Sequence, residues 1–225
     1  SWHIALWALV HAGAASDGCD IDRVVQMLLL HDLVEIDAGD HPIHLPNPGQ
    51  QAAEQAAALR LFGLLPDDLN HALLGLWQEF EAGQSPDACF ARLIDHTQPL
   101  FQVLCAARPR PDHVEIVRDN LAVGRASDLS RRWPEAYDAI TGLLSGTPVQ
   151  GAFARPLAFL TELDALKSVN RASTLCDGSR FENSAEHSWH IALYALILAD
   201  QAGAGVSAGR VIRMLLLHDI VEIDV

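Results

Sequence analysis

Two short stretches of the chain carry the same set of side chains suited to metal chemistry. Residues 28–37 read Leu-Leu-Leu-His-Asp-Leu-Val-Glu-Ile-Asp, so that His31 and Asp32 end an apolar run and Glu35 follows. Helical residues three apart share one face, so these side chains can converge on one point. An imidazole beside a carboxylate at a buried helix end is unfavourable unless a metal or a partner satisfies it. The same three positions in residues 215–224 are held by His218, Asp219 and Glu222. We therefore predict a metal site with a glutamate as proton carrier.

The two stretches belong to a longer internal repeat. Residues 1–37 (copy one) align with residues 188–224 (copy two) without a gap, and both begin Ser-Trp-His-Ile-Ala-Leu. The copies differ most in their middle, which is rich in Gly, Ala and Ser, where a turn tolerates substitution. Each copy is therefore predicted to be a helix, a turn and a second helix that ends at the His-Asp pair.

Composition predicts an all-α protein. Half of the residues are hydrophobic but only 6% are aromatic, and the formal net charge is −14. This charge argues against a polynucleotide partner. The four cysteines are scattered without a Cys-x-x-Cys pair, which favours reduced thiols and a cytoplasmic protein. No apolar run has the length of a membrane span, so we expect no membrane partner.

The segments between the copies also have helical patterns. Further helices are expected over residues 50–63, from Pro66 onward, and over 87–106, 112–128, 133–145 and 157–169. Residues 147–156 are rich in Gly and Pro and form the expected linker. Residues 172–184 are expected to be a polar loop.

Two further residues are candidates to complete the metal site. His187 opens the first helix of copy two, and Asp95 interrupts an otherwise apolar helical face, where an unpaired carboxylate is disfavoured. Two imidazoles and two carboxylates suit Mn, Fe, Co, Ni, Zn or Mg. Asp95 bonded to Arg92 or His96 is the structural alternative. His41, His44, His71, His96 and His113 are expected in loops or on the surface.

Together these motifs resemble the HD-domain superfamily of metal-dependent phosphohydrolases, and within it the 5′-deoxynucleotidase-like subgroup. The resemblance rests on the pattern His187, then His218-Asp219, then Asp95, which follows the order His, His-Asp, Asp once the chain is rotated. Leu166 to Arg171 and Leu76 to Glu81 match as well. The resemblance implies a helical bundle and hydrolysis of a small phosphomonoester, a (deoxy)nucleoside 5′-monophosphate, by metal-activated water.

The resemblance also implies roles for individual residues. One divalent cation is held by His187, Asp95 and one His-Asp pair, either His31-Asp32 or His218-Asp219. Glu35 or Glu222 acts on the attacking water or the leaving group, Asp40 orients the nucleophile or the sugar, and Arg171 binds the substrate phosphate.

The duplication leaves the organisation of the chain open. We expect residues 1–146 to be an HD domain without its first helix and first His ligand, followed by the linker and by the N-terminal part of a second HD copy over residues 157–225. The chain is then a fragment, a permuted form or an element-swapped form, and we expect a homodimer.

Two other functions compete with the phosphohydrolase. A split site would suit a non-catalytic module that binds nucleotide or metal or serves assembly. An HD-type oxygenase with two irons would need additional His ligands, for which His41, His44 and His71 are poorly placed.

Overall fold

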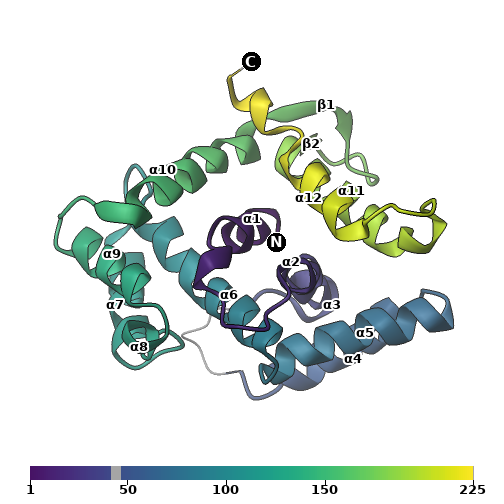
Figure 1. The fold of residues 1–225 in the computed structure, drawn as a ribbon, viewed down its shortest axis with the longest axis horizontal. Helices are drawn as coiled ribbons and strands as arrows, with labels where there is room; N and C mark the ends of the chain where they lie inside the picture. Colours follow the sequence, from purple (N-terminus) through teal and green to yellow (C-terminus); the bar gives the residue numbers. More distant parts are fainter. Residues whose placement is uncertain (42–46, 225) are drawn as a thin grey trace.

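The structure is a computed structural model that describes residues 1–41 and 47–224. It is an all-α protein with one small antiparallel hairpin, which confirms the predicted fold class (Figure 1). The helices surround a single hydrophobic cluster that draws side chains from both copies of the repeat. No helix in these two ranges is long and apolar enough to cross a membrane.

Copy one forms the predicted helical pair. Asp20 caps the second helix by accepting hydrogen bonds from the backbone N–H groups of Asp22 and Arg23. A short 3-10 segment then carries the His-Asp pair, so the site lies where the regular helix ends. The elements are α1 (Trp2–Val10), α2 (Ile21–Leu30), η2 (His31–Val34) and α3 (Glu35–Ala38).

The long helix α6 is the centre of the fold, and helices α1, α2, α5, α7 and α9 all pack against it (Figure 1). Ser85 caps α6, whose first residue is Pro86, and both features favour a helix start. The predicted helices agree closely with those observed between the copies, except that the helix expected over 112–128 ends at Ala122 and a separate short helix follows it. They are α4 (Gln50–Phe62), α5 (Asp67–Ala82), α6 (Pro86–Leu104), α7 (Pro111–Ala122), α8 (Leu129–Arg132) and α9 (Pro134–Leu144).

The structure differs from expectation in the segment taken as a linker. Phe153 is buried and stacks on Phe101 and His11, because a large aromatic gains more by joining the core than by remaining in water. The next helix also buries Leu157, Leu160 and Leu163, and it packs on α1 within the same hydrophobic cluster. The elements are η3 (Gly151–Phe153), α10 (Ala154–Leu163) and η4 (Asp164–Ser168).

The predicted polar loop contains a short hairpin that leads into copy two. Strands β1 (Asn170–Thr174) and β2 (Phe181–Asn183) pair antiparallel. Asn183 and Glu186 then form a capping box that starts the next helix. Copy two consists of α11 (Ser184–Ile197), α12 (Ala208–Leu217) and η6 (Ile220–Asp224).

The two copies contact each other in a reciprocal way. The indole Nε1 of Trp2 donates to the carbonyl of Leu216 at 2.9 Å, and that of Trp189 donates to the carbonyl of Leu29 at 3.1 Å. These are equivalent positions of the repeat, so each copy gives the other the same bond. Such an isologous contact is the mark of a two-fold relationship, and α1–α2 and α11–α12 are therefore related by a local pseudo-two-fold axis.

Candidate metal centre

The first half-site joins the end of α2 to the middle of α6. Nε2 of His31 lies 2.9 Å from Oδ1 of Asp32 and 3.4 Å from Oδ1 of Asp95. The imidazole is buried and tilts against the ring of Phe80 at 5.1 Å between centroids. Pro99 follows Asp95 by one helical turn and has no N–H to donate to the Asp95 carbonyl. This half-site consists of His31, Asp32 and Asp95.

Backbone contacts set the tautomer of the histidine. Nδ1 of His31 lies 3.0 Å from the carbonyl of Leu28, which can only accept a hydrogen bond. Nδ1 therefore carries a proton, and Nε2 points at the two carboxylates, to which the protonated ring donates. When the Nε2 proton is lost, the lone pair has the same direction. This is the orientation in which histidine binds metals.

The electrostatics agree with a site for a cation. Burial opposes protonation of His31, but hydrogen bonds to Asp32 and Asp95 outweigh it and raise the pKa of His31 to about 9. Burial likewise acts to raise the pKa of Asp32, yet the hydrogen bond from His31 prevails and lowers that pKa to about 2. The two carboxylates thus stabilise a positive charge at this point.

Glu35 is the candidate proton carrier in this half-site. Burial first, and then the charges of Asp32 and Asp40, raise the pKa of Glu35 to about 7. A carboxyl group with this pKa exchanges protons readily near neutral pH. Asp40 is exposed and lines the same cavity as Glu35.

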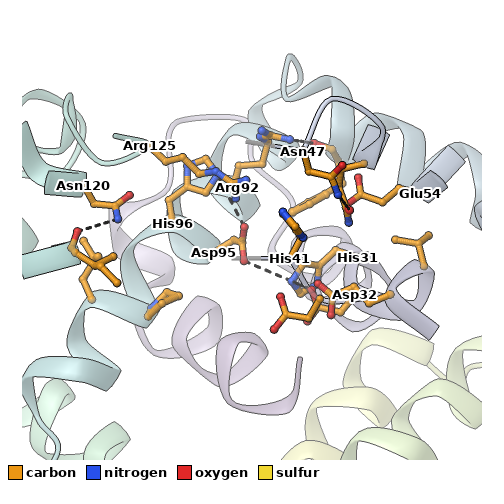
Figure 2. Close-up of a pocket in the computed structure, with 18 of the residues that line it drawn as sticks. His31, Asp32, His41, Asn47, Glu54, Arg92, Asp95, His96, Asn120 and Arg125 are labelled. Atoms are coloured by element: carbon orange, nitrogen blue, oxygen red, sulfur yellow. Dashed lines mark hydrogen bonds and ion pairs between the residues drawn. The ribbon is translucent and has the colours of Figure 1, made fainter. Parts of the chain in front are cut away.

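The cavity beside this half-site has a volume of about 630 Å³, and the residues that line it extend from His31 and Asp32 to Asn120 and Arg125 (Figure 2). Arg92 and His96 line the cavity close to Asp95, and Nε2 of His96 lies 3.9 Å from Oδ2 of that carboxylate. Asn120 and Arg125 line its far end. Basic and amide side chains therefore face the acidic metal-binding end across a space of small-molecule size.

The second half-site lies entirely in the C-terminal part of the chain. One ligand atom each from His187, His218 and Asp219 lies within 4.8 Å of the other two, and this is the one such group of three among the residues described. Nδ1 of His218 lies 2.8 Å from the carbonyl of Leu215, so its Nε2 faces Asp219 at 2.9 Å. The tautomer is the same as in the first half-site.

The remaining predicted residues of copy two have protein partners. Nη1 of Arg171 donates to Asp219 at 3.2 Å, and its Nε lies 3.6 Å from Glu182. Glu182 also lies 3.5 Å from Nδ1 of His187. The carboxylate of Glu222 accepts a hydrogen bond of 2.6 Å from the hydroxyl of Ser184.

In this arrangement the expected ligands are divided between the two half-sites. Asp95 joins the His-Asp pair of copy one, whereas His187 joins the pair of copy two. A second cavity of about 790 Å³ is lined by Ser1, Asp32 and Asp95 on one side and by Ala185 and Glu186 on the other. The start of α11 therefore lies close to the first half-site.

The structure also brings to the site residues that the sequence indicated only as structural partners of Asp95, or did not indicate. His96 was expected in a loop or on the surface, but its side chain is largely buried and lines the cavity, because it follows Asp95 on α6. Arg92 lies one turn before Asp95, and this spacing was the available signal. Glu54 comes from an Ala-rich helix that gives no signal, and His44 lies outside the described residues.

The residues present fit a divalent metal ion. Each half-site offers one imidazole whose Nε2 is oriented by a backbone carbonyl, together with carboxylate oxygens, and this mixed set suits borderline and hard divalent cations.

Comparisons with known proteins agree with this chemistry. The family described as "HD domain" matches residues 1–137 and 163–225. The 5′-deoxynucleotidase HDDC2 of Homo sapiens is 29% identical over 102 residues, which are 44% of this chain and 50% of that protein. The Bos taurus protein of the same name is 31% identical over 103 residues, or 45% of this chain and 49% of that protein. The chain thus spans about half the length of the curated relatives that it matches.

A solved structure extends the similarity to the fold. The crystal structure of a predicted metal-dependent phosphohydrolase from Magnetospirillum magnetotacticum MS-1 is 37% identical with a TM-score of 0.53, and the match covers 64% of this chain and 76% of that one. The family match covers both copies of the repeat and most of the sequence between them. The chain belongs to the HD-domain family.

Proposed function

We propose that the protein is a metal-dependent phosphohydrolase that releases phosphate from a (deoxy)nucleoside 5′-monophosphate. The observation that carries the proposal is the first half-site, where a tautomer-fixed His31 and two carboxylates border a cavity with a basic far end. The names of the curated relatives support this substrate class.

The proposed metal ligands are His187, Asp95 and one His-Asp pair. When bound, a divalent cation supplies an activated water molecule and polarises the phosphoryl oxygens. Asp95 and the imidazoles would hold the cation, and the carbonyls of Leu28 and Leu215 orient His31 and His218 so that Nε2 of each ring is available to it.

The proton steps are assigned to the glutamates. Glu35 removes a proton from the attacking water or delivers one to the leaving oxygen, since its pKa of about 7 suits both directions. Glu222 is its counterpart in copy two. Asp40, on the rim of the cavity, orients the sugar or the nucleophile.

We assign the binding of the substrate phosphate to arginine side chains. Arg171 was selected from the family pattern, and it now neutralises Asp219 and Glu182. A phosphate dianion can compete for it as a bidentate acceptor. Arg92 and Arg125 line the cavity of the first half-site and supply further positive charge there.

A phosphate-release assay tests the proposal. Purified protein is treated with chelator, supplied with Mn²⁺, Co²⁺ or Mg²⁺, and given matched 5′- and 3′-monophosphates of the same nucleoside. We expect metal-dependent release that favours the 5′ ester and is lost when Glu35 and Glu222 are both replaced by Gln. Absence of release with every metal, from protein shown to be folded, would contradict the proposal.

A non-catalytic nucleotide- or metal-binding module is the second candidate. The division of the ligands between two half-sites favours it. Binding of a nucleotide with a Kd that depends on metal, together with no phosphate release, would identify this function. For either function we propose a homodimer in the cytoplasm.

A further inference from the structure

Equivalent residues of the two copies have opposite exposure. Met27 and Val34 of copy one are 0% and 3% exposed, whereas their counterparts Met214 and Val221 are 61% and 70% exposed. The same contrast holds for Trp7 and Tyr194, at 2% and 54%. Copy two therefore presents to solvent the apolar face that copy one buries.

The structure shows what covers this face in copy one. Helices α5 and α6 form a groove in which α1 and α2 lie. Trp7 packs on Phe101 at 5.0 Å between ring centroids, and His31 packs on Phe80. At the rim, Arg23 forms ion pairs with Glu79 and with Asp87.

Copy two carries the side chains that this groove accepts. Arg210 aligns with Arg23, is exposed, and makes no ion pair within the described part of the chain. Ser207 aligns with Asp20 and likewise caps its helix. Most apolar positions are the same or similar: residues 27–30 and 214–217 are both Met-Leu-Leu-Leu, Val34 aligns with Val221, and Leu33 aligns with Ile220. Copy two thus matches the groove in shape and in charge.

The pseudo-two-fold axis makes an exchange of the copies possible without loss of their mutual contact. The hydrogen bonds from Trp2 to Leu216 and from Trp189 to Leu29 are equivalent. Both can therefore form whichever copy occupies the groove. Helix α11 already packs against α1 and α2. Eleven residues, 39–49, join α3 to α4, and a chain of that length spans about 35 Å when extended.

We propose that α11–α12 is an alternative occupant of the groove on α5 and α6, in the same chain, and that a divalent cation favours this exchanged arrangement. Exchange brings Asp95 to His187, His218 and Asp219 and so adds a fourth ligand. Trp7 fills its place in the groove better than the smaller Tyr194 would. Copy one is therefore the preferred occupant of the groove in the metal-free protein. Packing therefore favours copy one in the groove, whereas metal binding favours copy two. The occupant of the groove can then switch between two states, and the metal shifts the populations.

The two methionines provide a direct test, since each copy contains one. The full chain is labelled with ¹³C at the methionine methyl groups, and Met27→Leu and Met214→Leu assign the two NMR signals. A soluble gadolinium chelate broadens exposed methyl groups. In chelator-treated protein, we expect the gadolinium chelate to broaden the Met214 signal and to leave the Met27 signal sharp. In protein saturated with Zn²⁺, we expect the reverse.

Asp95→Asn and Asp138→Asn provide the matched pair of variants. Asp138 is exposed on α9, away from both half-sites. Asp95→Asn should abolish the Zn²⁺-dependent transfer and weaken Zn²⁺ binding at least about tenfold, whereas Asp138→Asn should behave as the parent. The Met27 signal in chelator-treated Asp95→Asn shows whether that variant is folded.

Three results would overturn the inference. Met27 could remain protected in Zn²⁺-saturated protein, or Asp95→Asn could leave the transfer intact. Because a homodimer is proposed in any case, mass alone does not decide this point: protection of Met214 that needs less Zn²⁺ as the protein concentration rises would assign the covering helices to a second copy of the chain instead. The inference rests on the metal site proposed above, but its readout needs no turnover and so can fail independently of the phosphate-release assay.

Discussion

Nε2 of His31 and Oδ1 of Asp95 lie 3.4 Å apart and connect the end of α2 with the middle of α6. This contact explains how an acidic residue is stable on an apolar helical face, because the buried imidazole is its partner. Because the same contact belongs to the candidate metal site, replacing Asp95 tests that site directly.

Replacement of Asp95 by Asn should weaken divalent metal binding by about tenfold or more, since an amide oxygen carries no charge for the cation. Isothermal titration with Mn²⁺ measures the effect. Asp138→Asn, exposed on α9, is the control and should match the parent protein. Equal affinities in both variants would remove Asp95 from the ligand set.

Replacement by Gln of the glutamate beside the metal, which is Glu35 in the arrangement described and Glu222 in the exchanged one, should lower kcat for phosphate release by about 10²- to 10⁴-fold, the range typical of a lost general acid or base. KM should change little, because the amide preserves the shape of the side chain. Glu54→Gln is the control within the same cavity. A similar loss in both variants would indicate a general electrostatic effect rather than proton transfer by Glu35.

His11 should make stability dependent on pH. Burial among Trp7, Trp133 and Phe153 lowers its pKa to about 4. Between pH 6.5 and 4 the unfolded chain binds more protons at this residue, so the free energy of unfolding rises with pH across that window and falls on acidification, by on the order of 3 kcal/mol. Urea unfolding at pH 4.5 and 7 should show a smaller difference in His11→Leu, which introduces the residue found at the equivalent position of copy two. If His11→Leu leaves the difference in unfolding free energy between pH 4.5 and 7 unchanged, groups other than His11 cause the pH dependence.

Phe153 should be a core residue although it lies in a segment rich in Gly and Pro. Phe153→Ala should reduce the free energy of unfolding by about 3–5 kcal/mol, as is typical of a buried Phe. Phe159→Ala on α10 is the matched control, because that side chain is 43% exposed and should cost much less. Equal and small effects would mean that residues 147–156 are a simple linker.

Local patterns in the sequence predicted the helices well. The apolar periodicity and caps placed α4, α5, α6 and α9 to within a few residues, and the repeat identified both helical pairs. Asp95 stood out because a charge on an apolar face needs a partner. These features depend on neighbours within a turn or two of helix.

Features that depend on distant contacts were not predicted. Asp95 has two equivalent His-Asp pairs to choose between, and nothing in the repeat decides which of them reaches α6. Phe153 is a single aromatic in a Gly- and Pro-containing segment, and its burial depends on the space between Phe101 and Trp133. The reciprocal bonds of Trp2 and Trp189 likewise exist only once the two copies meet.

The groove on α5 and α6 gives the order of synthesis a structural role. The ribosome completes residues 1–104 well before it makes residues 188–224, and domains tend to fold as they emerge. Copy one therefore meets the groove without a competitor during translation. A chain refolded from urea presents both copies at once, so freshly translated and refolded protein should begin with different populations of the two arrangements.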